Sequence, residues 1–173
     1  DDVLPYFVKS ERNERLADSF HGTEGPLSVV DVPHRHPLSA AFVRAAQQTG
    51  MRYNGDFNGA SQLGVGFFQV TQRGGERESA AAAFLRPAMR RGGVALELEA
   101  EVERILFEGR TAVGVAWRRR GARQEARATR GVIVSAGTLG SPKLLMLSGI
   151  GDGDELARVG VETRIHLPGV GRN

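Results

Sequence analysis

The spacing of hydrophobic and polar residues changes several times along the chain, and each change predicts a different kind of element. In the first half, apolar residues recur at helical spacing in three segments and form two short apolar runs. They predict helices over residues 1–11, 37–50 and 80–86, and strands over residues 27–30 and 64–71. Ser79 is the expected N-cap of the third helix, and Pro87 is expected to end or kink it.

The predicted helix over residues 37–50 has the clearest boundaries. Pro37 suits the first helical position, and Gly50 suits the position just past the last turn. Between them, residues at helical spacing make one apolar face. The face consists of Leu38, Ala41, Phe42, Ala45 and Ala46.

The second half begins with the period-two alternation of strands that have one solvated face. It predicts strands over residues 94–99, 102–107, 112–117 and 124–129, the last three joined by tight turns into a β-meander. A continuously apolar run over 131–137 then predicts a strand buried on both faces, as in a parallel sheet. Ser141 and Pro142 suit the N-cap and first residue of a helix that ends at 147, with Gly149 just beyond its last turn. Another helix is expected over 154–159.

The most informative unit is the buried strand, small-residue turn and helix start between residues 132 and 147. In a doubly wound sheet, ligands bind outside the carboxyl ends of the strands, which is where Ala136 and Gly137 lie. Their small side chains let a ring or a ribose approach the backbone, and the helix start adds N–H groups. The pattern fits a nucleotide site in an α/β sheet, although such a pattern is more often a tight turn packed on a helix.

Composition narrows the class of protein. Apolar residues make up 40% of the chain and charged residues 25%, which is typical of a folded domain and not of a disordered segment. The net charge of +3 comes with arginines spread along the chain, which argues against a dedicated nucleic-acid-binding protein. The absence of cysteine excludes disulfides and thiolate metal sites, and no apolar run approaches the ~18 residues of a membrane span.

Candidate metal ligands are weak on sequence grounds. His34 and His36 have a spacing that suits a metal, but the prolines around them and the lack of a third ligand favour solvated loop histidines. Asp56 and Asn58 resemble the start of a calcium loop that lacks its later acidic ligands, so a turn is favoured. We therefore predict no metal site.

Other polar residues are also assigned structural roles. His21 is expected in a turn and not in acid–base chemistry, and His166 is expected to be exposed before a Pro-Gly loop. The arginine-rich stretch over 118–130 could contact phosphates, but it lacks interleaved aromatic residues. A solvated sheet edge is therefore favoured there.

Residues 137–151 read GTLGSPKLLMLSGIG, which matches position for position a signature of the glucose–methanol–choline (GMC) oxidoreductases. The chain is thus identified as similar to this family, and further segments resemble it in the same order. They are Leu4–Phe7, His21–Leu27, Asp56–Gly59, Gly75–Ala80, Phe84–Pro87, Arg104–Leu106, Ala112–Val115 and Leu167–Asn173. The segment Asp56–Gly59 looks most like the bacterial choline-dehydrogenase and aliphatic-alcohol-dehydrogenase branch.

The resemblance implies a fold and a domain organisation. The fold class is α/β with α+β character. Residues 91–173 would be part of a Rossmann-like FAD-binding domain that includes the β-meander, the buried strand and the following helix. Residues 1–90 would be part of a substrate-binding domain built on an antiparallel sheet.

The resemblance also implies a cofactor, FAD, and residues that bind it. Val102 falls where the backbone of the family contacts the adenine. Ser135, Ala136 and Gly137 fall where the family lines the adenosine part of FAD. The implied activity is oxidation of an alcohol, choline or a primary alcohol, with hydride transfer to flavin N5. A bacterial protein is implied, located in the cytoplasm or peripherally at a membrane that holds its electron acceptor.

The departures from the family limit these expectations. The N-terminal G-x-G-x-x-G of the family and its C-terminal histidine with a partner His or Asn have no counterpart, so no catalytic residue is assigned. The chain is expected to be the central section of a longer enzyme, and to be inactive and without tight FAD binding when isolated. The alternative is a non-catalytic binding or scaffold protein of the same fold without flavin, as expected if the natural chain ends at Asn173.

Overall fold

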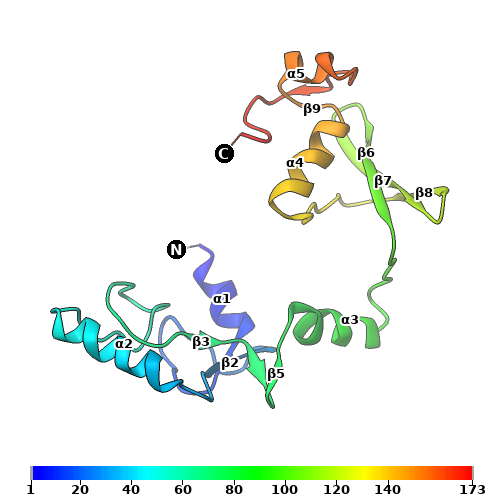
Figure 1. The fold of residues 1–173 in the computed structure, drawn as a ribbon. Helices are drawn as coiled ribbons and strands as arrows, with labels where there is room; N and C mark the ends of the chain where they lie inside the picture. Colours follow the sequence, from blue (N-terminus) through cyan, green and yellow to red (C-terminus); the bar gives the residue numbers. More distant parts are fainter. Residues whose placement is uncertain (1, 173) are drawn as a thin grey trace. The chain divides into compact units, whose positions relative to one another are not determined.

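The computed structural model of the chain describes residues 2–172. Asp1, where the first predicted helix begins, and Asn173, the last residue of the final family-like segment, lie outside the described residues. The chain divides into two compact units, unit 1 (Asp1–Ala95) and unit 2 (Leu96–Asn173) (Figure 1). Helices and strands occur in both units, so the protein has the mixed α/β character that its sequence predicts.

Unit 1 combines helices with short strands. Its elements are α1 (Leu4–Ser10), β1 (Glu11–Asn13), β2 (Leu27–Asp31), α2 (Pro37–Gln48), β3 (Gln69–Val70), β4 (Gln72–Arg73), β5 (Glu76–Arg77), the π-helix η1 (Ala81–Leu85) and α3 (Arg86–Arg90). β2 is central to a small sheet, because it pairs in parallel with β1 and antiparallel with β3. The first two predicted helices and the predicted strand over 27–30 are confirmed.

Two glycines let the chain after β1 pass directly against the end of α1. A Cβ on Gly22 would lie 1.8 Å from the Val8 carbonyl oxygen, and a Cβ on Gly25 would lie 2.3 Å from the Ser10 carbonyl carbon. Real Cβ atoms do not approach backbone atoms so closely, so a larger residue at either position would displace one segment. The segment that carries His21 is thereby held beside β1.

The predicted apolar face of α2 is not buried within the described chain. Val43 is the buried residue of α2, whereas Leu38 is 73% exposed and Phe42 is 70% exposed. Val43 lies on a different side of the helix from Leu38 and Phe42, which are one turn apart. The sequence pattern therefore gave the helix correctly, but the described residues do not cover its most apolar side.

Two predicted strands are shorter than expected or lack a partner. Within the segment 64–71, Val65 forms an isolated bridge with Tyr53, and only β3 pairs with β2. The segment 94–99 is irregular and pairs with no strand in the described chain, so this strand prediction is wrong. Glu99 has a left-handed φ of 55°, which interrupts the extended backbone that alternation alone predicts.

The third predicted helix continues past Pro87. Ser79 acts as expected at its start, because its Oγ accepts a hydrogen bond from the Ala82 N–H at 3.2 Å. The chain then winds as η1, where the Arg86 N–H bonds to the Ala81 carbonyl five residues earlier, and continues into α3. Pro87 lies in the first turn of α3, where a missing N–H is tolerated. The proline therefore accompanies a change of helix type and does not end the helix.

Unit 2 is built on the predicted β-meander. Its elements are β6 (Glu101–Glu108), β7 (Thr111–Arg119), β8 (Ala122–Arg127), α4 (Gly137–Leu147), β9 (Ile150–Gly151), α5 (Gly153–Arg158) and β10 (Ile165–His166). The antiparallel order β6-β7-β8 confirms the meander, and α4 packs beside β6 (Figure 1). β9 and β10, which the sequence analysis missed, form a parallel pair too short to produce a periodic pattern.

The arginine-rich face of the meander is neutralised by glutamates. Arg118 and Arg123 both reach Glu103, at 2.8 and 3.2 Å, and Arg127 reaches Glu108 at 2.9 Å. Arginines whose charge is already paired are poor phosphate ligands. The observation agrees with a solvated sheet edge and not with a phosphate site.

The predicted buried strand over 131–137 is wrong for the described chain. Residues 131–136 pair with no described strand, and Ile133 is 93% exposed. A strand buried on both faces of a sheet needs neighbouring strands and covering helices, and none of the described residues supplies them. The segment is apolar as predicted, but its burial would need neighbouring strands and covering helices that the described residues do not supply.

Helix α4 begins one turn earlier than its Ser-Pro pair suggests. It starts at Gly137, and Pro142 lies inside it. Ser141 does not cap the helix, since its Oγ instead accepts a hydrogen bond from the Ala136 N–H at 3.0 Å. That bond folds the preceding backbone back onto the helix and allows a first turn over 137–140. Gly149 follows the last turn with a left-handed φ of 81°, as predicted.

Candidate functional site

A pocket between β6 and α4 brings together two of the four residues expected to bind a cofactor. The pocket has a volume of about 600 Å³, and Val102 and Ala136 both line it. Ser135 and Gly137 flank Ala136 in the chain but do not line this pocket. The other lining residues are Ala100, Glu101, Glu103, Arg104, Arg118, Arg123, Gly140, Lys143, Leu144 and Leu147. We call this pocket the β6–α4 pocket.

One wall of the β6–α4 pocket is the edge of a sheet. β6 is an outer strand of the β6-β7-β8 sheet, so one side of its backbone has no strand partner among the described residues. Val102 is paired with Trp117 across the other side. The outer backbone groups near Val102 are therefore available to hydrogen-bond the edge of a planar ring.

The opposite wall is the first part of α4, where small residues leave room. Ala136 and Gly140 present little side chain to the pocket, and the first turn keeps them close, since a Cβ on Gly140 would lie 3.0 Å from the Ala136 Cβ. Gly137 has a left-handed φ of 82°, which a larger residue adopts only with strain. The sequence Ala-Gly-x-x-Gly thus keeps this wall thin.

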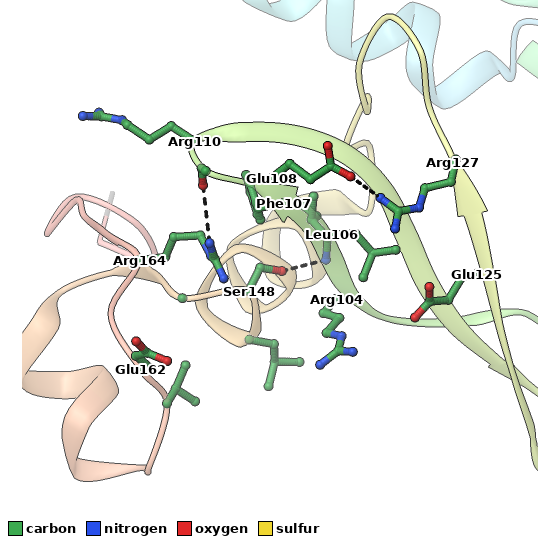
Figure 2. Close-up of a pocket in the computed structure, with 15 residues that line it drawn as sticks. Arg104, Leu106, Phe107, Glu108, Arg110, Glu125, Arg127, Ser148, Glu162 and Arg164 are labelled. Atoms are coloured by element: carbon green, nitrogen blue, oxygen red, sulfur yellow. Dashed lines mark hydrogen bonds and ion pairs between the residues drawn. The ribbon is translucent and has the colours of Figure 1, made fainter.

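A buried serine fixes the two walls relative to each other. The Ile105 N–H on β6 donates to the Ser148 Oγ at 2.9 Å, and the Ser148 hydroxyl donates to the Leu144 carbonyl in α4 at 2.6 Å. Figure 2 shows the first of these bonds beside the end of α4. Ser148, Leu144 and Ile105 are all buried. Because Val102 lies on β6 and Ala136 directly precedes α4, this serine determines the spacing between the walls.

The residues directly after Ser148 pack closely against the backbone at Glu162. A Cβ on Gly149 would lie 2.6 Å from the Glu162 carbonyl oxygen, so the backbones pass at a distance that only glycine permits. Ile150 and Gly151 are buried in β9, which pairs with β10. The segment Ser148–Gly151 therefore has a structural role in unit 2.

The rim of the β6–α4 pocket is charged. Arg118 donates a hydrogen bond to Glu103 at 2.9 Å, and this bond, with the nearby arginine charges, lowers the pKa of Glu103. Glu103 is therefore ionised at neutral pH and compensates Arg118 and Arg123. Among the described residues, Lys143 and Arg104 form no ion pair. A pocket with an apolar floor and free cations at its rim suits a planar heterocycle that carries an anionic group.

A larger cleft of about 800 Å³ lies at the C-terminal end of β6 and shares Arg104 and Leu147 with the β6–α4 pocket (Figure 2). Of the four arginines that line it, Arg127 and Arg164 are held by neighbouring groups. Arg127 pairs with Glu108, and Arg164 lies over the Phe107 ring, with 5.4 Å to its centroid, and donates to the Gly109 carbonyl at 3.4 Å. Glutamates also line the cleft, which makes it a mixed-charge surface. It contains none of the residues expected to bind a cofactor.

Unit 1 contains a buried histidine that the sequence analysis placed only in a turn. His21 is 4% exposed, and its two ring nitrogens face carboxylates of Glu11 and Asp56. Asp18 belongs to the same cluster, since one ligand-type atom from each of Asp18, His21 and Asp56 lies within 4.8 Å of the others. Hydrogen bonds account for all three side chains, so we assign no metal to the cluster.

The sequence held only a weak signal for this cluster. Glu11 and Asp56 lie 10 and 35 residues from His21 in the chain, so no local spacing predicts that they meet it.

The remaining candidates have structural roles. The His36 Nδ1 accepts a hydrogen bond from the Leu38 N–H at 3.2 Å and so caps α2, and His34 is exposed. His166 is exposed as predicted, and its Nδ1 accepts from the Gly153 N–H at 3.1 Å. Asp56 Oδ1 accepts from a backbone N–H two residues later, which forms the predicted turn.

Comparison with known proteins identifies the family of the chain. The profile of the family described as GMC oxidoreductase matches residues 1–173. The chain belongs to the GMC oxidoreductase family. The match includes every residue of the β6–α4 pocket, so the pocket is part of the family domain.

Relatives within the GMC family show what the chain is similar to. It is 45% identical over 170 residues to the mitochondrial choline dehydrogenase of Homo sapiens, a match that covers 98% of this chain and 29% of the relative. It is 44% identical over 170 residues to an alcohol dehydrogenase [acceptor] of Pseudomonas putida, which covers 96% of this chain and 31% of the relative. The chain thus spans less than a third of the length of these relatives.

A solved structure supports the fold. The chain matches an FAD-dependent oxidoreductase from Chaetomium thermophilum with a TM-score of 0.89 and 27% identity, over 96% of this chain and 32% of that protein.

In the described part of the GMC chain, none of the helices has the length and apolar character needed to cross a membrane.

Loss of the Ser148 hydroxyl is expected to loosen the junction between β6 and α4. Ser148→Ala leaves the buried Ile105 N–H without a partner, which costs about 1–3 kcal/mol. Hydrogen exchange of the full-length protein, followed by mass spectrometry, measures this locally: protection should fall in peptides from β6 and α4. The control Ser39→Ala changes an exposed serine in α2 and should leave those peptides unchanged. Equal protection in Ser148→Ala and wild type would contradict a tethering role.

Proposed function

We propose that this chain is the central part of an FAD-dependent oxidoreductase that oxidises the CH–OH group of choline or a primary alcohol. The observation that carries the proposal is the match of the GMC family over residues 1–173, together with 45% identity to a choline dehydrogenase. The identity to an alcohol dehydrogenase is nearly the same, so both substrates stay in the proposal. Hydride transfer from the alcohol carbon to flavin N5 is the proposed reaction.

The β6–α4 pocket is the proposed site for the adenosine part of FAD. Its shape supports this, since the free edge of β6 near Val102 faces the small residues Ala136 and Gly140 across a space that fits a planar ring. Ser135 and Gly137 would support the same site by holding Ala136 in place. Lys143 at the rim would face the charged side of the cofactor. When bound, FAD supplies the hydride acceptor, whereas these residues bind and orient its adenosine half.

The two units are proposed to belong to two functional domains. Unit 2 contains the β6–α4 pocket and would be part of the FAD-binding domain. Unit 1, with its small sheet around β2, would be part of the substrate-binding domain. The electron acceptor in this proposal is either oxygen or a membrane quinone, with the enzyme in the cytoplasm or peripherally at the membrane.

The function is tested on the full-length protein. The purified protein should have the visible absorption of oxidised flavin, and anaerobic addition of choline or a primary alcohol should bleach it. The substrate that bleaches the band identifies the alcohol. A well-folded protein without a flavin band would contradict the proposal and would favour a scaffold role of the same fold.

Enlarging Ala136 is expected to weaken FAD binding. Ala136→Leu would fill part of the β6–α4 pocket, and overpacking of about 1–3 kcal/mol corresponds to a loss of roughly five- to 150-fold in affinity. The measurement is the dissociation constant of FAD from deflavinated full-length protein, with circular dichroism to verify folding. Ala122→Leu is the matched control, because Ala122 is exposed on β8 and lines none of the pockets described here. The same affinity in both variants would show that Ala136 does not face FAD.

The isolated 173-residue chain is expected to be inactive. It exposes apolar residues such as Ile133 at 93%, which need partners that the described residues do not provide. It should therefore neither retain FAD on gel filtration nor oxidise choline or ethanol with a dye as electron acceptor. The full-length protein assayed in parallel is the positive control. Turnover by the isolated chain would refute this expectation.

A further inference from the structure

We propose that His21 is a proton-operated latch that holds the loop over residues 54–63 against β1 in unit 1. The latch consists of His21, Glu11 and Asp56. These residues lie outside the β6–α4 pocket, and the latch does not depend on the proposed function.

The two carboxylates of the latch favour a doubly protonated ring, and the Asn13 amide, whose Nδ2 lies 3.4 Å from the His21 Nδ1, already donates to Glu11 and Gln69. The His21 Nδ1 lies 3.1 Å from Glu11 Oε2, and its Nε2 lies 3.1 Å from Asp56 Oδ2. Both partners are carboxylates, which only accept hydrogen bonds when ionised. A neutral imidazole has one N–H and can satisfy only one of them. Both contacts are therefore favourable only when His21 is an imidazolium ion.

The charges around His21 favour the same protonation state. The carboxylates of Glu11 on β1, Asp18 in the following loop and Asp56 in the 54–63 loop lie around the ring. The cation Arg15 is paired with Asp31 at 3.0 Å and donates to the Gly55 carbonyl at 2.9 Å, so it also contacts the 54–63 loop but does not act on the charge of His21. Burial lowers the pKa of His21, but the hydrogen bonds and charges of Asp56 and Glu11 outweigh it and raise that pKa above its ordinary value.

The Asp56 carboxylate, which accepts the hydrogen bond from His21, also shapes the loop. Asp56 Oδ1 accepts the Asn58 N–H at 3.0 Å, which closes a tight turn. A Cβ on Gly59 would lie 2.1 Å from Asp56 Oδ2, so only glycine leaves room for the carboxylate in its latched position. The turn and the contact with His21 therefore share one carboxylate.

The latched loop forms a wall of a pocket in unit 1. Asn58 and Gln62 from the loop line a space of about 390 Å³, together with Phe7, Phe20 and His21. Movement of the loop changes this wall. The protonation of His21 thus controls the shape of an aromatic pocket that His21 and Glu11 themselves line.

The direction of the pH effect follows from linkage. The closed state binds the His21 proton more tightly than the open state, in which the pKa is about 6.5. The latch is fully closed below that value. Above it, the ratio of open to closed loop rises by up to about tenfold per pH unit until the pH passes the raised pKa of the closed state, and then stays constant.

Hydrogen exchange of the full-length protein tests the latch. After correction for the intrinsic pH dependence of exchange, peptides that cover residues 54–63 should lose protection as the pH rises above about 6.5, whereas peptides from the β-meander should not. Asp56→Asn should flatten this dependence, because its amide can donate to a neutral Nε2 while Nδ1–H donates to Glu11. His34→Gln removes an exposed histidine and should retain the wild-type pH dependence.

Two results would overturn the proposal. One is a wild-type loop whose corrected protection does not change with pH, and the other is an Asp56→Asn protein that keeps the wild-type slope. If Asp56→Asn does not fold, nitrogen NMR of histidine-labelled wild-type protein decides: a His21 ring that keeps both nitrogens protonated to a higher pH than a histidine in a short peptide supports the latch. A His21 ring that loses its second proton at the same pH as the peptide, or at a lower pH, contradicts it.

Discussion

The hydrogen bond from the Ile105 N–H to the Ser148 Oγ holds the candidate site of unit 2 together. Val102 is on β6 and Ala136 precedes α4, so their separation depends on how these elements are joined. The bond is buried, and Ser148 also donates to the Leu144 carbonyl, which ties both elements to one hydroxyl. In a buried position, the loss of such a hydroxyl leaves an unpaired N–H and costs more than the bond itself contributes.

The GMC signature over residues 137–151 therefore combines two physical roles. Its first part, from Gly137 to Gly140, keeps one wall of the β6–α4 pocket thin. Its last part, Ser148–Gly151, fastens α4 to β6 and passes the chain closely past Glu162. A sequence motif that looks like a ligand-binding loop thus also has residues in packing contacts, which gives Ser148 and Gly149 a structural role.

Local patterns predicted the elements whose partners are close in sequence. The β-meander, α1, α2 and the end of α4 at Gly149 follow from periodicity and turn residues alone. Burial was harder to predict: the 131–137 segment is apolar but unpaired, and the apolar side of α2 is exposed. These faces depend on partners that local sequence does not specify.

The site shows the same division between local and distant information. Val102 and Ala136 line one pocket. They were predicted from the resemblance to a family and not from the periodicity of the sequence. The environment of His21 escaped prediction because its two carboxylates come from positions 10 and 35 residues away. Ser141 was misassigned as an N-cap because its hydrogen bond to the Ala136 N–H runs backwards along the chain.

A crystal structure of the full-length protein with its cofactor tests the central claim most directly. The account predicts that the adenosine half of FAD lies between Val102 and Ala136, with the Ile105–Ser148 bond intact beneath it. An adenosine bound elsewhere, with the β6–α4 pocket filled by protein side chains, would contradict the account.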